Sequence, residues 1–160
     1  MTLEIIPHPP QLIQLTNKRL IIFDSCVYIV DKNKKGNVLA VLGKKLRKYR
    51  LQNIVPLVVL NEISKITKSN FNENVKNIER KLGTFIISER TEDIINEAKR
   101  LEEKYYECHR PDSIILATTK IHGAILVTLD SKLLRTAQLE GVDAYHLSDF
   151  MKSWRSQNWF

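Results

Sequence analysis

Four acidic residues stand where an apolar run stops or where a helix-like segment begins: Asp24, Glu62, Asp112 and Asp130. Apolar runs of this length, separated by helical stretches, are typical of buried strands in a parallel sheet. In such sheets, ligands bind beyond the carboxyl ends of the strands. Carboxylates that converge there would form a hard anionic site suited to Mg²⁺ or Mn²⁺.

The chemistry that such a site would serve is phosphodiester hydrolysis. One or two divalent ions held by carboxylates can activate a water molecule and neutralise the charge that develops on the phosphate. We therefore expect the four acids to act as metal ligands more than as proton carriers. Ser25 and Thr128 are polar neighbours that could orient a carboxylate or a water molecule. For Thr128, an ordinary strand residue is the alternative interpretation.

Each acid also has a plain structural interpretation. Asp24, Asp112 and Asp130 all stand before helical patterns and could be helix N-caps. Glu62 could simply be exposed on its helix. Considered together, however, the acids follow strands of one sheet or open the helix that leads into a strand. This shared placement favours a common metal site.

Other chemistries fit the sequence poorly. It contains no Gly-rich phosphate loop and no G-x-S-x-G motif. The four histidines show no ligand spacing, and Cys26 and Cys108 lie too far apart to match a zinc pattern. We expect both cysteines to be reduced, buried thiols, as is usual inside cells.

The elements that must position the acids can be predicted from periodicity. Apolar runs predict five strands, at residues 20–24, 54–58, 84–88, 124–128 and 142–147. Between them, helices are expected over about 36–46, 59–68, 91–105, 111–123 and 131–139, and 69–82 is predicted to be a loop running into a helix. Pro56 fits the end of its strand better than the middle, because proline donates no hydrogen bond to a sheet. Thr91 is expected to cap a helix, and Gly123 and Gly141 to end two others.

This alternation predicts a three-layer α/β/α fold with a central, mostly parallel sheet of about five strands. At 160 residues the chain fits one domain, which we place at residues 20–148. An extended arm (1–19) precedes it, and an aromatic tail (149–160) follows. The tail would pack on its own domain or form a dimer or partner surface. With no long apolar segment and no signal-peptide pattern, we expect a cytoplasmic protein without a membrane partner.

The formal net charge of +7 favours a polyanionic partner such as RNA, or merely solubility. Basic residues cluster between positions 32 and 50. We expect four of them to hold RNA backbone near the acidic edge: Lys44, Lys45, Arg47 and Lys48. A solvated helix face is the alternative interpretation of this cluster. Arg110, close to Asp112, is a further candidate for a phosphate contact.

The four acidic segments resemble those of PIN-domain nucleases. The matching segments are Phe23-Asp24-Ser25, Val59-Leu60-Asn61-Glu62-Ile63, the stretch 110–118 and the stretch 126–134. Leu129 stands where many relatives have Asn. The resemblance spans about residues 19–148, and the order and spacing of the four motifs make it specific. It implies a PIN-like fold and a Mg²⁺- or Mn²⁺-dependent ribonuclease in which these four acids form the metal cluster.

The resemblance also implies partners. Many single-domain members of the family are VapC-like toxins, usually homodimers, that an antitoxin protein holds inactive. Other members process ribosomal RNA precursors, and a PIN-like module that binds RNA or protein without cutting is a further alternative. We expect the toxin, because the chain is one compact domain with no added RNA-binding module or zinc ribbon.

Overall fold

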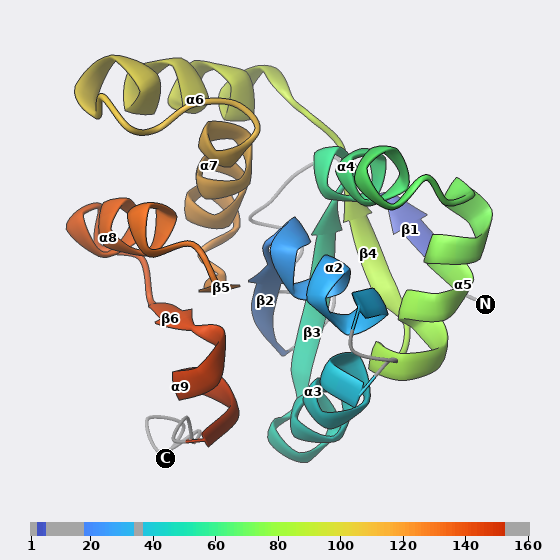
Figure 1. Cartoon of the computed structure of the whole chain (residues 1–160). Helices are drawn as coiled ribbons and strands as arrows, with labels where there is room; N and C mark the ends of the chain where they lie inside the picture. Colours follow the sequence, from blue (N-terminus) through green and yellow to red (C-terminus); the bar gives the residue numbers. More distant parts are fainter. Residues whose placement is uncertain (1–2, 6–17, 34–36, 153–160) are drawn as a thin grey trace.

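The computed structural model describes residues 3–5, 18–33 and 37–152. The fold is built on a six-stranded sheet in which every paired strand is parallel, in the order β1-β4-β3-β2-β5-β6 (Figure 1). The strands are β1 (Leu3–Ile5), β2 (Arg19–Phe23), β3 (Leu51–Pro56), β4 (Phe85–Ser88), β5 (Ile125–Thr128) and β6 (Ala144–His146). The helices are α2 (Ser25–Asn33), α3 (Asn37–Tyr49), α4 (Leu57–Thr67), α5 (Phe71–Leu82), α6 (Glu92–Lys104), α7 (Asp112–His122), α8 (Ser131–Leu139) and α9 (Leu147–Lys152).

The predicted three-layer α/β/α fold is confirmed, with one strand more than expected. The additional strand, β1, comes from the segment predicted to be an extended arm, and its backbone pairs with β4. The remainder of that arm lies outside the described residues. Pro56 is the last residue of β3, as the missing N–H of proline requires. The segment 69–82 is almost entirely helix α5, which Asn70 caps through hydrogen bonds from the N–H groups of Asn72 and Glu73.

The order of the strands divides the helices between the two faces of the sheet. From β2 the chain moves through β3 to β4, and α2, α3, α4 and α5 pack together along that path. It then crosses back to β5 and β6, and α6, α7 and α8 pack together on the other side (Figure 1). The direction of winding therefore reverses between β2 and β5. Such a reversal opens a crevice at the carboxyl ends of the strands.

Helix ends follow the predicted chemistry. The hydroxyl of Thr91 accepts a hydrogen bond from the Ile94 N–H, 3.2 Å away, and so caps α6. Gly123 ends α7 with a φ of 63°, a conformation that glycine adopts without the steric cost of a Cβ. These two signals fix where the chain enters and leaves the α6–α7 pair.

Aromatic side chains anchor the C-terminal part of the domain. Phe150, in α9, is fully buried and meets Phe23 edge-on, with ring centroids 6.3 Å apart. The ring of Tyr145 also lies near that of Phe150, with centroids 6.1 Å apart. The first aromatic residue of the predicted tail therefore packs on its own domain, while residues 153–160 lie outside the described part of the chain. Among the described residues, no helix combines the length and apolarity needed to cross a membrane.

Two contacts hold the α2–α5 layer together: a buried acid on α2 and a close approach between α3 and α5. Asp31, which is fully buried, accepts hydrogen bonds from the Leu39 N–H at 2.8 Å and from the Lys81 ammonium at 2.9 Å. Gly43 faces the Lys81 carbonyl, and a Cβ built on Gly43 would lie 2.0 Å from that oxygen. Only glycine permits this contact, so the packing of the α2–α5 layer depends on it.

Candidate active site

The first and last acids meet at the point where the winding of the sheet reverses. Asp24 directly follows β2, and Asp130 lies two residues beyond the end of β5. These strands are neighbours, with Phe23 in register with Val127, and the Asp24 N–H donates to the Val127 carbonyl at 3.0 Å. Both carboxylates therefore lie at the crevice where parallel sheets bind ligands.

Asp24 is held rigidly by its neighbours. Its side chain is only 4% exposed. The Ser25 N–H donates to Oδ1 at 2.7 Å, and the Thr128 hydroxyl and the Cys26 thiol donate to Oδ2 at 2.8 and 3.1 Å. A buried carboxylate with several hydrogen-bond donors is fixed in place. Ser25 and Thr128, both predicted to orient a carboxylate, therefore contact Asp24.

Ser25 also links the first acid to the second. Its hydroxyl donates a short hydrogen bond to Oε1 of Glu62 and lies 3.4 Å from Oδ1 of Asp24. Glu62 is half-buried on α4, which begins immediately after β3 at the same edge of the sheet. The structure therefore brings the carboxylates of Asp24 and Glu62 to either side of one hydroxyl.

Asp112 is the acid with the least support from its surroundings. It is the first residue of α7, is half-buried, and accepts no hydrogen bond from the residues that the structure describes. Burial and, to a lesser extent, the negative charges of Asp24, Asp130 and Glu62 together raise the pKa of its carboxyl to about 7. Asp112 therefore lies in the combined field of the other three acids.

Asp130 caps a helix with one of its two carboxylate oxygens. Its Oδ1 accepts hydrogen bonds from the Lys132 and Leu133 N–H groups, at 2.8 and 3.3 Å, so it is the N-cap of α8. Its own N–H donates to the Thr128 hydroxyl at 3.0 Å. Oδ2 accepts no hydrogen bond from the described residues and is left for another partner. The cap interpretation is therefore correct for Asp130 without excluding a ligand role.

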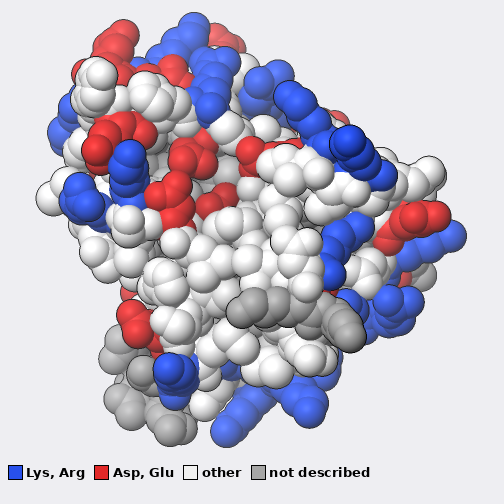
Figure 2. All heavy atoms as spheres, viewed as in Figure 1, with Lys and Arg blue, Asp and Glu red and all other residues white. Residues whose placement is uncertain are grey.

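These four acids fit a divalent cation in charge and in donor type. None of them forms an ion pair with a described residue, although ion pairs are common elsewhere on the surface. Figure 2, which has the same view as Figure 1, shows acidic side chains gathered near the middle of the face toward the viewer. Within the described part of the chain, however, no three His, Cys, Asp or Glu side chains are already arranged around one point that a metal ion could occupy.

A residue that sequence reasoning missed supports the first acid. Cys26, predicted only to be a buried thiol, donates to Asp24 and accepts from the Leu129 N–H at 3.4 Å. Burial and the charge of Asp24 raise the pKa of this thiol to about 12, so it stays neutral and acts as a donor. Its position two residues after Asp24, in the first turn of a helix, is the signal that could have identified it. Cys108 is buried and free, as expected.

The predicted basic cluster lies elsewhere. Helix α3 ends one residue before β3 begins, so Arg47 and Lys48 lie at the amino-terminal edge of the sheet. The length of β3, roughly 20 Å, separates that edge from the acids. The prediction that these residues lie near the acidic edge is therefore wrong. Lys44, in the same helix, contributes to the same surface.

The other two predicted phosphate contacts are already engaged. The ammonium of Lys45 donates to the carbonyls of Phe150 and Met151 and lies 5.0 Å from the centroid of the Phe150 ring, so it fastens α9 to α3. Arg110 donates to Glu102 at 3.0 Å. Glu102 also accepts a hydrogen bond from the Ser113 hydroxyl, at 2.5 Å. Arg110 thus lies near Asp112 but is paired.

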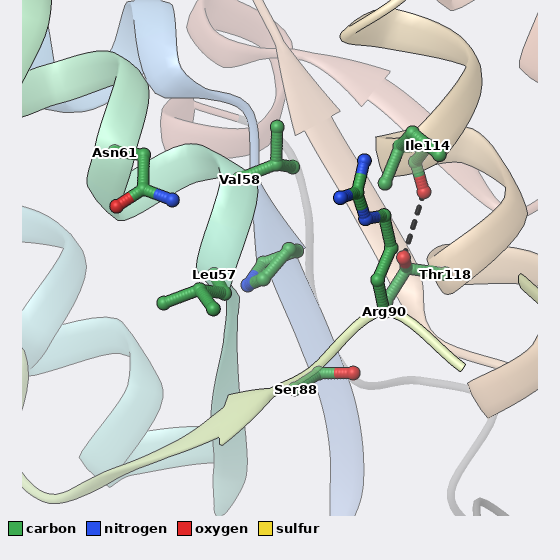
Figure 3. Close-up of a pocket in the computed structure, with 8 residues that line it drawn as sticks. Leu57, Val58, Asn61, Ser88, Arg90, Ile114 and Thr118 are labelled. Carbon is green, nitrogen blue, oxygen red and sulfur yellow. Dashed lines mark hydrogen bonds between the residues drawn. The ribbon is translucent and has the colours of Figure 1, made fainter. Parts of the chain in front are cut away.

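A cavity of about 130 Å³ lies beside the acids, between the start of α4 and α7 (Figure 3). Asn61, next to Glu62 in the chain, lines it, and so does Arg90, from the segment between β4 and α6. Sequence patterns gave no reason to select either residue. The full lining is Pro56, Leu57, Val58, Asn61, Ser88, Arg90, Ile114 and Thr118.

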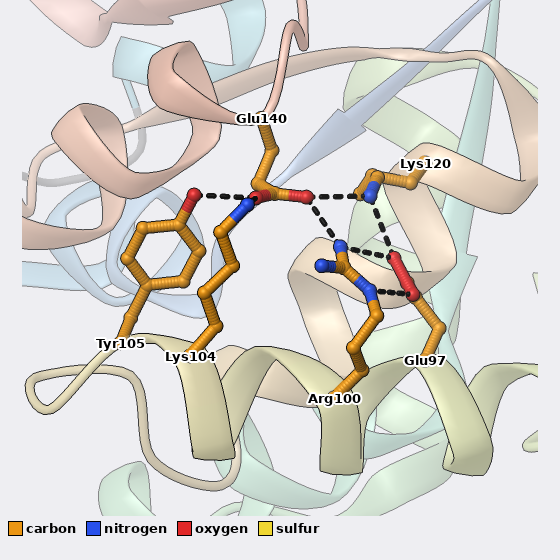
Figure 4. Close-up of polar contacts among 6 residues, drawn as sticks. All are labelled: Glu97, Arg100, Lys104, Tyr105, Lys120 and Glu140. Carbon is orange, nitrogen blue, oxygen red and sulfur yellow. Dashed lines mark hydrogen bonds and ion pairs between the residues drawn. The ribbon is translucent and has the colours of Figure 1, made fainter.

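A polar network holds the helices that carry the last two acids. Glu140, just after α8, has a side chain that is only 5% exposed, and it accepts hydrogen bonds from four donors (Figure 4). The donors are Arg100, Lys104 and Tyr105, from α6 and its end, and Lys120 of α7. Burial alone would raise the pKa of Glu140, but these donors hold it well below its usual range. The network therefore joins α6, α7 and the end of α8.

Comparisons with known proteins agree with this fold. A structure titled VapBC2 from Rickettsia felis, bound to a promoter DNA fragment, matches with a TM-score of 0.63 and 15% identity, covering 79% of this chain and 98% of that one. VapBC-1 from nontypeable Haemophilus influenzae matches with a TM-score of 0.62 and 11% identity, over 81% and 98% of the two chains. A toxin–antitoxin complex from Klebsiella pneumoniae matches with a TM-score of 0.52 and 27% identity, over 70% and 88%. No curated protein matches the sequence.

A family model described as PIN domain matches residues 21–148. That range contains all four acids, the whole of β3, β4, β5 and β6, and most of β2. The chain therefore belongs to the PIN domain family.

Proposed function

We propose that this protein is a metal-dependent endoribonuclease that hydrolyses RNA phosphodiester bonds in the cytoplasm as the toxin of a toxin–antitoxin pair. The observation that carries the proposal is the convergence of four carboxylates at the crevice of a PIN domain, without an ion pair to any described residue. Mutually repelling carboxylates are stabilised by a cation. A Mg²⁺ or Mn²⁺ ion would satisfy them.

Asp24, Glu62, Asp112 and Asp130 would hold the ion. When bound, the ion supplies a water of lowered pKa and neutralises charge on the phosphate. The chain itself contributes by holding these carboxylates in position. The N–H of Ser25, the hydroxyl of Thr128 and the thiol of Cys26 fix the Asp24 carboxylate, and the cap at α8 fixes Asp130. Such supporting contacts keep ligand oxygens in place while the substrate binds.

The names given to the similar structures support the toxin role. Those from Rickettsia felis, Haemophilus influenzae and Klebsiella pneumoniae are titled as VapBC proteins or as a toxin–antitoxin complex. By this likeness we propose an antitoxin partner and a homodimer. A ribosomal RNA maturation nuclease would use the same acids and differ in substrate only. A PIN module that binds without cutting is a second candidate, because no three ligands are already assembled among the described residues.

Cleavage of structured RNA with Mg²⁺ or Mn²⁺ tests the activity. Wild type should cut, a chelator should stop it, and Asp24→Asn and Asp112→Asn should each lose most of the rate. Asp143→Asn is the matched control, because Asp143 precedes β6 at the opposite edge and pairs with Arg19 at 2.5 Å. Folded Asp24→Asn and Asp112→Asn proteins with full activity would exclude the proposed cluster. Binding of RNA without cleavage under any divalent ion would favour the binding module.

Induced expression in cells separates the biological roles. If the protein is a toxin, expression of the wild type should arrest growth and expression of Asp24→Asn should not. Co-expression of a small neighbouring reading frame should relieve the arrest. Harmless expression, together with uncut ribosomal RNA precursors in a deletion strain, would instead assign the maturation role.

A further inference from the structure

The cavity beside the acids is lined by four apolar and four polar residues, none of which has a role in the proposed cleavage. It lies at the carboxyl edge of the sheet, because Pro56 and Ser88 are the last residues of β3 and β4. Ile114, another lining residue, is on the first turn of α7, which begins with Asp112. A molecule held by the acids would therefore reach this cavity with an adjoining group.

Two of the polar side chains that line the cavity are already satisfied. The Ser88 hydroxyl pairs with Nε2 of His122 at 3.0 Å, and the Thr118 hydroxyl donates to the Ile114 carbonyl at 2.7 Å. Asn61 and Arg90 are different. Their side chains are exposed at the mouth and make no hydrogen bond or ion pair with the residues that the structure describes. These two groups are the ones available to a ligand.

The walls indicate what kind of group would enter. Pro56, Leu57, Val58 and Ile114 give the cavity apolar sides, and Figure 3 shows Arg90 lying between Val58 and Ile114. A free phosphate would gain nothing from apolar walls and would lose hydration there. A flat ring with a hydrogen-bonding edge fits better, because its faces contact apolar groups while its edge meets a guanidinium and a carboxamide.

We propose that this cavity binds the base of a nucleotide next to the scissile phosphodiester, with Arg90 and Asn61 recognising the edge of that base. The inference rests on the proposed RNA cleavage and adds a source of sequence preference to it. Arg90 also adds a positive charge to the edge of the sheet that carries the four acids, which suits an anionic chain. Side chains of these two types are the usual readers of purine edges.

The test compares Arg90→Ala and Asn61→Ala with wild type on single-stranded oligoribonucleotides that differ in one base near the cleavage site. Each variant should raise KM about tenfold for the preferred base, the loss expected for a hydrogen bond involving a charged or well-placed partner. It should also flatten the preference at one position while kcat changes little. Arg80→Ala is the control, because it removes the same charge from an exposed site on α5, near the other edge of the sheet. Unchanged KM and unchanged base preference in Arg90→Ala would overturn the inference.

A binding measurement separates this inference from the proposed function. Fluorescence anisotropy of labelled oligonucleotides is recorded in the Asp24→Asn background, with and without Arg90→Ala. Base-dependent affinity that disappears with Arg90→Ala supports the pocket even if the wild type cuts no RNA, in which case only the proposed activity fails. Equal oligonucleotide affinity with and without Arg90, combined with loss of antitoxin binding, would assign the cavity to a protein partner and overturn the RNA inference.

Discussion

Asp112→Asn should make the metal-free protein more stable at pH 8. In the wild type, burial and the charges of Asp24, Asp130 and Glu62 raise the pKa of Asp112 to about 7, from 3.8. A shift of about three units corresponds to at most about 4 kcal/mol of differential stability. Because the side chain is partly exposed, solvent screening reduces the expected effect to about 1–2 kcal/mol.

The sign of the pH dependence follows from the direction of this shift. A carboxyl with a raised pKa in the folded state contributes stability that is fully present below its unfolded pKa, near 4. That contribution is lost as the pH rises through about 7. The wild type should therefore lose stability between about pH 4 and pH 8 relative to Asp112→Asn, which cannot ionise at this position.

Urea unfolding in the presence of a chelator, at pH 5 and pH 8, measures the effect. The variant should be the more stable protein at pH 8, and the difference should shrink at pH 5. Adding Mn²⁺ at pH 8 should stabilise the wild type more than the variant, because the ion binds only the folded state. A variant that is less stable than the wild type at both pH values would refute the idea that the acids repel one another.

Three further predictions follow from other contacts. Glu140→Gln should cost about 1–3 kcal/mol by weakening the polar network; since the pKa of Glu140 is depressed, the wild-type advantage in thermal melts should be present above about pH 4.5 and fade as the pH falls below it. Gly43→Ala should cost about 1–3 kcal/mol in urea unfolding, because the new methyl group would press on the Lys81 carbonyl; an unchanged midpoint would mean that α3 and α5 separate freely. Reversing Arg47 and Lys48 to Glu should weaken binding of long RNA and reduce its salt dependence, yet leave base preference unchanged, since these residues lie far from the acids; an unchanged salt slope would leave them a solvated face.

The acids and the sheet could be predicted because local sequence determines them. A run such as Leu20–Phe23 is buried on both faces of a parallel sheet, so the polar residue that ends it must lie at the edge. Asp24 and Asp130 follow directly from this rule. The cap of α6 by Thr91 and the end of α7 at Gly123 depend equally on one residue and its nearest neighbours.

Features that depend on distant contacts could not be predicted. Strand β1 has three residues and gains its structure from pairing with β4, about 80 residues later in the chain. Lys45 lies in a basic cluster, but its bond to the Phe150 carbonyl joins residues 105 positions apart. The cavity with Arg90 forms from three separate segments; two of them carry motifs that drew attention to their acids, and the segment with Arg90 carries none.

The predicted location of the basic cluster was wrong for a different reason. A helix that leads into a parallel strand must end at the amino-terminal edge of the sheet, so the position of Arg47 could have been deduced from topology. Clustering of charge indicated a surface, but it carried no information about which edge that surface occupies.

Calorimetric titration with Mn²⁺ tests the central claim most directly. The account predicts that wild type and Asp143→Asn bind the ion alike, whereas Asp24→Asn and Asp112→Asn bind at least about tenfold more weakly, as expected when one carboxylate ligand is lost. Equal Mn²⁺ affinity in all four proteins, with the fold intact, would contradict a metal site built from these acids.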